Sequence, residues 1–180
     1  MHNLHIVIIG FKNVGKSSIG IALAERLKRG FIDLDEKICE HHQRQTGNKM
    51  TCREIMNRHG EKYFRTIEHE VLGEIIAVPE PLVLAVGGGT PMMEENVALL
   101  SQYLVVLIAA PKGIVFERIM INGKPAFFPK DREAFETFQQ LWGEREPVFK
   151  KLARMTVENT GSVEEAVAKI EKDLHLHSKT

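Results

Sequence analysis

Short apolar runs alternate along the chain with longer segments in which apolar residues recur at helical spacing. The short runs predict strands at residues 4–9, 30–33, 81–85, 103–109 and 155–158. The longer segments predict helices at residues 16–29, 35–45, 52–57, 61–78, 94–101, 112–120, 132–153 and 162–174. Thr51 followed by Glu54 has capping-box spacing, which supports a helix start at residue 52. This alternation is typical of a three-layer α/β domain with a parallel sheet.

The loop after the first predicted strand carries the pattern GxxxxGK[ST], filled by Gly10, Gly15, Lys16 and Ser17. In such a loop the backbone N–H groups wrap a phosphate, the Lys neutralises the outer phosphates and the hydroxyl ligates Mg²⁺. A strand before the loop and a helix after it favour this interpretation over a bare glycine turn. We therefore predict that a nucleotide is bound by Gly10, Lys12, Asn13, Val14, Gly15, Lys16, Ser17 and Ser18.

Two carboxylates follow the second predicted strand. Asp33 and Asp35 are two residues apart, a spacing that places both on one side of a strand, at the edge of the sheet where ligands bind. One could organise Mg²⁺ through water, and the other could hold or deprotonate an attacking hydroxyl. Taken alone, the pair is more typical of a strand end followed by a helix cap.

Composition narrows the classes of function. A chain of 180 residues fits one domain, predicted at 1–180. Lys+Arg and Asp+Glu are balanced at 24 each, so we expect no nucleic-acid or membrane partner. The chain has no signal-peptide pattern, no apolar run of membrane-spanning length and only two Cys, which predicts a cytoplasmic location. The paired His41 and His42 lie in a polar stretch and are expected to be solvated.

The segment NVGKSS is also similar to the phosphate-binding loop of GTPases. That class needs a DxxG turn to sense the γ-phosphate and an NKxD segment to read guanine. No DxxG occurs in this chain, and the nearest match to NKxD, Asn48-Lys49-Met50-Thr51, lacks the Asp. A GTPase is therefore a distant alternative to a kinase.

The segments GEKYFRTIEHEVL and LAVGGGTPMMEENVALL, together with the phosphate loop and FIDLDEKI, resemble shikimate kinase in order and separation. The resemblance runs from Leu4 to the last predicted helix. It implies a P-loop fold of the nucleoside-monophosphate-kinase type, with a five-stranded parallel sheet in the order 2-3-1-4-5 and a lid at about residues 121–131. It also implies transfer of the γ-phosphate of ATP to the 3-hydroxyl of shikimate, with one Mg²⁺ ion.

The resemblance assigns roles to the acceptor side. Asp35 matches the residue that orients the reacting hydroxyl, and Lys16 matches the one that follows the phosphoryl group. Carboxylate binding falls to Arg65 and Arg145, with Glu68 on the same helical face fixing Arg65. The turn that meets the ring hydroxyls matches Gly87, Gly88 and Gly89, and the metal ligands match Ser17 and Asp33.

The lid departs from the family pattern. Lys124-Pro125 stands where the family has Arg-Pro, so Lys124 keeps the charge that stabilises transfer but lacks the bidentate fork. Arg118 matches the residue that stacks on adenine. A longer stretch after Asp35 adds about one helical turn by the 3.6-residue period.

Two functions remain as alternatives to shikimate kinase. One is a kinase of the same fold for another hydroxy acid such as gluconate, and the other is a regulatory domain that binds ATP with an impaired lid. We expect a monomer.

Overall fold

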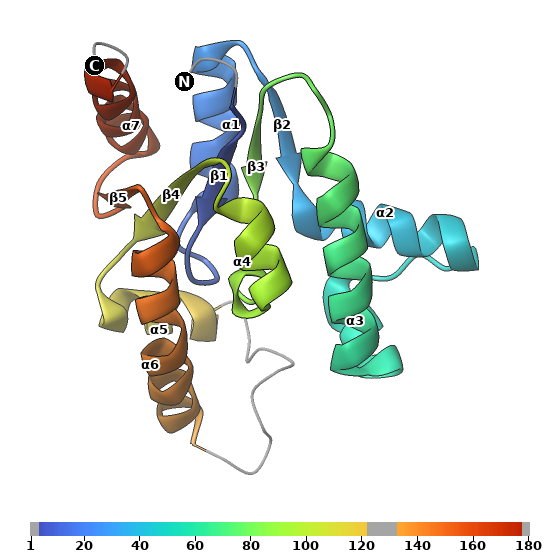
Figure 1. Cartoon of the computed structure of the whole chain (residues 1–180). Helices are drawn as coiled ribbons and strands as arrows, with labels where there is room; N and C mark the ends of the chain where they lie inside the picture. The colour runs from blue at the N-terminus through green and yellow to red at the C-terminus, as the bar shows by residue number, and fades with distance from the viewer. Residues whose placement is uncertain (1–3, 122–132, 178–180) are drawn as a thin grey trace.

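The computed structural model describes residues 4–121 and 133–177 as a five-stranded sheet flanked by helices (Figure 1). The strands are β1 (Ile6–Ile9), β2 (Gly30–Asp33), β3 (Leu82–Ala85), β4 (Leu104–Ala109) and β5 (Met155–Glu158). The helices are α1 (Lys16–Leu27), α2 (Leu34–Thr46), α3 (Cys52–Ile76), η1 (Thr90–Met92), α4 (Glu94–Leu100), α5 (Lys112–Ile121), α6 (Ala134–Leu152) and α7 (Val163–His177).

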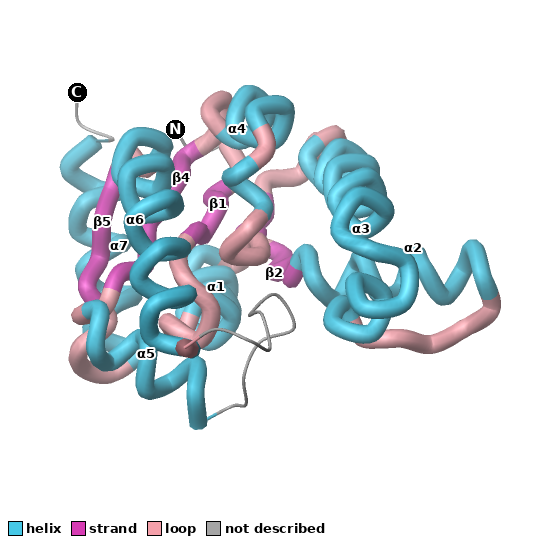
Figure 2. The backbone as a smooth tube through the Cα atoms, turned by 90° about the horizontal axis from the view of Figure 1, so that it is seen from below, coloured by secondary structure: helices cyan, strands magenta, loops and turns pink. Residues whose placement is uncertain are grey.

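All four strand pairs are parallel, and the order is β2-β3-β1-β4-β5. This confirms the predicted fold class and strand order. Strands β1 and β3 are buried along their whole length, as expected of strands covered on both faces. Figures 1 and 2 place α1 and α4 on opposite faces of the sheet, and α7 packs beside α1. The parallel connections bring the carboxyl ends of β1, β2 and β3 to one edge, where the phosphate loop begins.

Backbone geometry explains two glycines of the phosphate loop. Gly10 has φ 145° and Gly15 has φ 95°, values that side-chain-bearing residues rarely adopt. A Cβ on Gly10 would also collide with the carbonyl oxygen of Ile108 in β4, and one on Gly15 would lie 2.5 Å from Asn159 Nδ2. The loop therefore presses against β4 and the end of β5 before α1 starts at Lys16.

The helices α2 and α3 form an arm beyond the β2 edge of the sheet, at the opposite end from α5 and α6 (Figure 2). Thr51 and Glu54 form the predicted capping box at the start of α3. The two predicted helices, at 52–57 and 61–78, are the two parts of α3, which meet at a break in helical geometry at Gly60 (φ 85°, ψ 165°). Elsewhere the predicted elements are present, and their ends differ from the prediction by at most three residues, because hydrogen bonds rather than the apolar pattern set the limits.

The expectation of solvated histidines in α2 is wrong. His41 is 9% exposed and His42 is fully buried. The cause is the packing of α2 on α3, which brings the His42 ring to 5.2 Å from His59 and its Nδ1 to 3.3 Å from the Tyr63 hydroxyl. The sequence of α2 gives no apolar pattern for its buried face, because the buried residues there are polar and pack against other polar and aromatic residues.

Two further expectations concern a membrane crossing and the lid. Among residues 4–121 and 133–177, none of the helices combines the length and the apolar character that a membrane crossing requires. The predicted lid at about 121–131 lies, except for Ile121, outside the described residues, and so does Lys124. The domain limits of 1–180 stay a prediction.

Candidate active site

A cleft with a cavity volume of about 260 Å³ opens at the carboxyl edge of the sheet. It lies between the phosphate loop, the end of β2, the turn after β3 and the helices α3 and α6. Most of the predicted site residues line this cleft, namely Lys12, Asn13, Lys16, Ser17, Asp33, Asp35, Arg65, Glu68, Gly87, Gly88, Gly89 and Arg145. Gly10, Val14, Gly15 and Ser18 belong to the same loop but do not line the cleft, and Arg118 stands on α5.

The phosphate loop is held by contacts from distant parts of the chain. The Lys16 ammonium donates to the carbonyl oxygen of Phe11 at 2.9 Å, across the loop. Asn13 has φ 63°, and its amide donates to the Arg118 carbonyl oxygen at 3.1 Å, which places α5 beside the loop. The Val14 carbonyl oxygen accepts from Asn159 Nδ2 at 2.8 Å. These contacts preform a cradle of backbone N–H groups that suits a phosphate.

Ser17, Asp33 and Asp35 form a compact oxygen cluster beside Lys16. The Ser17 hydroxyl donates to Asp33 Oδ2 at 2.6 Å, while Asp33 Oδ1 accepts from the backbone N–H of Asp35 at 3.0 Å. Asp33 thus ends β2 and caps α2, and Asp35 lies in the first helical turn. Strand alternation is therefore the wrong reason for their proximity, although both carboxylates do line the cleft.

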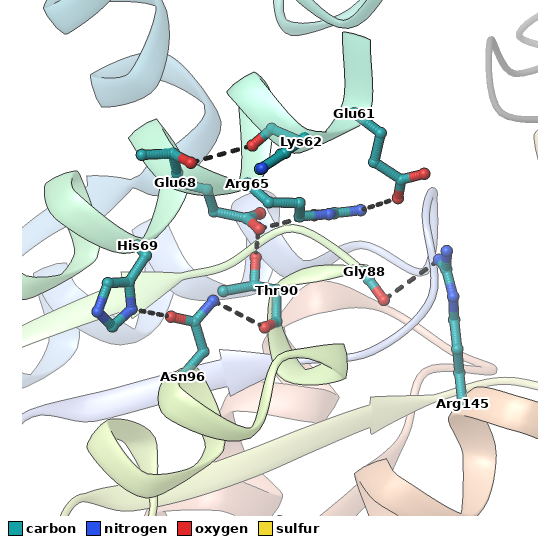
Figure 3. Close-up of polar contacts among 10 residues, drawn as sticks. Glu61, Lys62, Arg65, Glu68, His69, Gly88, Thr90, Asn96 and Arg145 are labelled. Carbon is teal, nitrogen blue, oxygen red and sulfur yellow. Dashed lines mark hydrogen bonds and ion pairs between the residues drawn. The ribbon is translucent and has the colours of Figure 1, made fainter.

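Two arginines lie on either side of the glycine turn (Figure 3). Arg65, on α3, donates through Nη1 to Glu68 Oε2 at 2.6 Å, and its Nη2 lies 3.6 Å from Glu61 Oε1. Arg145, on α6, donates to the Gly88 carbonyl oxygen at 3.2 Å. A Cβ on Gly89 would collide with the Arg65 guanidinium. The glycine turn therefore lies between the two guanidinium groups, and a side chain at Gly89 would force the Arg65 guanidinium to move.

Comparison with known proteins agrees with this geometry. The family model for shikimate kinase matches residues 12–175. The chain belongs to the shikimate kinase family. It is 36% identical to the shikimate kinase of Francisella tularensis subsp. novicida over 88% of this chain and 86% of that protein. It is 30% identical to the shikimate kinase of Macrococcus caseolyticus over 91% of this chain and 92% of that protein.

Solved structures give the same family. The structure of shikimate kinase from Acinetobacter baumannii in complex with shikimate has a TM-score of 0.83 and 31% identity, covering 98% of this chain and 94% of that one. A gluconokinase from Sinorhizobium meliloti has a TM-score of 0.60 at 18% identity, a likeness that shows the shared fold alone.

In this shikimate kinase family member, Asp35 and Lys16 are among the cleft groups that have shifted pKa values. Burial, and next the charge of Asp33, raises the pKa of Asp35 to about 6, although its side chain stays accessible to cleft water. Burial lowers the pKa of Lys16 to about 8, against the opposing pull of Asp35 and Asp33. At neutral pH the first is ionised and close to its pKa, while the second is still mostly a cation. Such values suit proton transfer and phosphate binding near neutral pH.

Sequence reasoning missed several cleft residues, namely Cys52, Arg53, Met56, Phe64 and Val86. The first three lie in the first half of α3, before the break at Gly60. The capping box of Thr51 and Glu54 predicted a helix here, but no pattern in the local sequence indicates that this helix lines the cleft. The Cys52 thiol donates to the Asp35 carbonyl oxygen at 3.2 Å and lies 3.5 Å from Cys39 Sγ, so α3 is tied directly to the start of α2.

Proposed function

We propose that this member of the shikimate kinase family transfers the γ-phosphoryl group of ATP to the 3-hydroxyl of shikimate. One observation carries the acceptor assignment. The guanidinium groups of Arg65 and Arg145 flank the glycine turn, and the phosphate loop and Asp35 line the same cleft. A small ring that bears a carboxylate at one end and hydroxyls at the other matches this distribution of charge.

The two arginines bind the carboxylate of the acceptor. Burial, and next the charge of Arg65, lowers the pKa of Arg145, because two cations share one side of the cleft. An incoming carboxylate relieves this repulsion and accepts charge-assisted hydrogen bonds from planar donor forks. Both guanidinium groups are placed before the acceptor arrives, Arg65 by Glu68 and Arg145 by the Gly88 carbonyl. Binding the carboxylate then directs the ring hydroxyls toward Asp35.

Asp35 orients the reacting hydroxyl and accepts its proton. A Cβ on Gly87 would lie 3.1 Å from Asp35 Oδ1, so the bare glycine backbone leaves the carboxylate open to the ring. Lys16 holds the transferring phosphoryl group, and its pKa rises again when phosphate oxygens replace lost water. Because phosphoryl transfer depends mainly on positioning and on charge stabilisation, these two residues carry the chemistry that the described part of the chain supplies.

Magnesium fits the oxygen cluster at Ser17 and Asp33. Mg²⁺ keeps several waters and takes only one or two oxygen ligands from the protein, and these two side chains, 2.6 Å apart, supply a hydroxyl and a carboxylate. The described residues contain no group of three His, Cys, Asp or Glu side chains placed for a tighter metal site. When bound, the ion neutralises charge on the phosphate oxygens. Ser17 would ligate it directly and Asp33 through water.

The nucleotide contacts on the other side of the loop complete the proposal. The phosphates are wrapped by residues of the phosphate loop, namely Gly10, Lys12, Asn13, Val14, Gly15 and Ser18. Arg118, on α5, stacks on the adenine. Lys124, the expected cation of the lid, lies outside the described residues. A location in the cytoplasm and a monomeric state also stay predictions.

The test is ADP release by the purified chain with MgATP, measured with and without shikimate and with gluconate as the rival acceptor. We expect turnover that depends on shikimate and that Asp35→Asn lowers by about 100-fold or more, the usual contribution of a general base. Turnover with gluconate but not shikimate would overturn the acceptor assignment. Binding of both ATP and shikimate without turnover would instead favour a regulatory domain.

A further inference from the structure

A buried chain of hydrogen bonds runs behind the acceptor side of the cleft, from α3 through η1 to α4 (Figure 3). Its centre is Glu68, a carboxylate that is only 1% exposed. One oxygen of Glu68 accepts from Arg65 Nη1 at 2.6 Å, and the other accepts from the Thr90 hydroxyl at 2.7 Å. Each carboxylate oxygen thus has its own donor, so the plane of the carboxylate is fixed from two directions.

Thr90 links this carboxylate to the glycine turn. Its hydroxyl is fully buried, and its backbone N–H donates to the Gly87 carbonyl oxygen at 3.1 Å. A Cβ on Gly87 would lie 3.2 Å from Thr90 Oγ1, 3.5 Å from Glu68 Oε1 and 3.1 Å from Asp35 Oδ1. One residue therefore contacts both the backbone that faces the acceptor ring and the carboxylate that holds Arg65.

Two more side chains hold Thr90 in place. The buried Asn96, on α4, donates through Nδ2 to the Thr90 carbonyl oxygen at 3.0 Å. Its Oδ1 lies 2.7 Å from His69 Nδ1 and accepts the imidazole N–H, because the amide nitrogen is already used as a donor. The contacts leave α3 at Glu68 and return to it at His69, the next residue. This arrangement clamps the turn against α3.

We propose that Thr90 is a positioning residue for the acceptor, supported by Asn96 and His69. Its hydroxyl keeps Glu68 in the orientation that aims the Arg65 guanidinium at the acceptor carboxylate. A buried carboxylate that loses a donor turns toward its remaining partner, and the guanidinium turns with it. The inference rests on the proposed function, in which Arg65 binds that carboxylate, and adds the residues that set the direction of Arg65.

The test compares Thr90→Val, which keeps the shape but lacks the hydroxyl, with Thr90→Ser, which keeps the hydroxyl. We expect Thr90→Val to raise the KM for shikimate roughly tenfold, the effect of one unsatisfied buried group, and to leave the KM for MgATP within about twofold. Thr90→Ser should stay within about threefold of the unmodified chain in both constants. For a shikimate analogue with an uncharged hydroxymethyl group in place of the carboxylate, the KM should be the same in all three proteins.

Several outcomes would overturn the proposal. They are an unchanged KM for shikimate in Thr90→Val, an equal rise in both KM values, and a Thr90→Ser variant as impaired as Thr90→Val. A chain without any shikimate-dependent turnover would overturn the proposed function first and this inference with it. If Thr90→Val does not fold, His69→Ala tests the partly exposed end of the chain of contacts. It should raise the KM for shikimate about threefold with the KM for MgATP unchanged, and no rise would count against the proposal.

Discussion

At the scale of single residues, the proposed role of Asp35 as a base predicts that activity depends on pH. Its carboxylate must be ionised to accept a proton, and its pKa of about 6 means that it is ionised above that value. We expect kcat/KM for shikimate at saturating MgATP to fall about tenfold per pH unit below pH 6. The residual activity of Asp35→Asn should lack this acid limb. An acid limb that persists at the same pH in the variant would assign it to another group.

The same shift predicts an effect on stability. Because the folded-state pKa of Asp35 is raised from 3.8 to about 6, folding favours the protonated form. This contribution to stability is present below the unfolded pKa and is lost as pH rises through about 6. At pH 7.5 the ionised side chain is therefore unfavourable, and Asp35→Asn should raise the free energy of unfolding by about 1 kcal/mol, reduced because cleft water screens the charge. Urea unfolding of both proteins at pH 7.5 and pH 4 checks this, since most of the difference should disappear at pH 4.

Gly89 offers a steric probe of the acceptor site. Its φ of −101° suits any residue, so a substitution there tests space and not backbone strain. Gly89→Ala pushes the Arg65 guanidinium aside and should raise the KM for shikimate roughly tenfold or more, because small displacements of a binding group have large effects. The KM for MgATP should not change. Gly143→Ala is the matched control, since a Cβ at that position on α6 meets nothing within 4 Å.

At the scale of elements, the break in α3 at Gly60 positions one wall of the cleft. Gly60 has φ 85° and ψ 165°, a region open essentially to glycine alone, so Gly60→Ala should lower the free energy of unfolding by about 1–3 kcal/mol. Met56 precedes the break and Phe64 follows it, and both line the cleft. A shift between the two halves of the helix should therefore raise the KM for shikimate more than the KM for MgATP.

A second glycine of the same helix serves as the control for that variant. Gly73 has ordinary helical geometry, and a Cβ there meets nothing within 4 Å. Gly73→Ala should therefore stabilise the protein by about 0.5–1 kcal/mol through helix propensity. If the break is required, thermal or urea unfolding should show changes of opposite sign in the free energy of unfolding for the two variants. Equal stabilisation by both substitutions would show that α3 tolerates a straight course.

Elements with strong periodicity and clear caps were predictable, and contacts between elements were not. The strands, the phosphate loop and the capping box of Thr51 follow from local pattern, whereas the strand order came from the family resemblance. The burial of His42 depends on how α2 packs on α3, and no local pattern encodes that packing. The same holds for Thr90 and Glu68, which are 22 residues apart in sequence and share a 2.7 Å hydrogen bond. Arg65 and Glu68 could be paired in advance because both lie on one helical face.

At the scale of the whole molecule, the two sides of the cleft are anchored by different parts of the chain. The acceptor side depends on α3, η1 and α4, and on α6 through Arg145. The phosphate loop depends on the far edge of the sheet. There Asn159, just after β5, donates to the Val14 carbonyl oxygen at 2.8 Å. Among the described residues, none of the hydrogen bonds of Asn159 goes to the acceptor side. This separation predicts that variants of the two regions affect the KM values of different substrates.

Asn159 tests the nucleotide side of this division. Asn159→Ala leaves the buried Val14 carbonyl oxygen without its amide donor and removes the group that Gly15 packs against. An unsatisfied buried acceptor costs about 1–3 kcal/mol, so we expect the KM for MgATP to rise about tenfold and the KM for shikimate to stay within about twofold. Thr156→Ala, on the exposed side of β5, should change neither value. An equal rise in both KM values would mean that the loop and the acceptor site respond as one unit, because a disturbance at β5 would then reach α3 through the sheet.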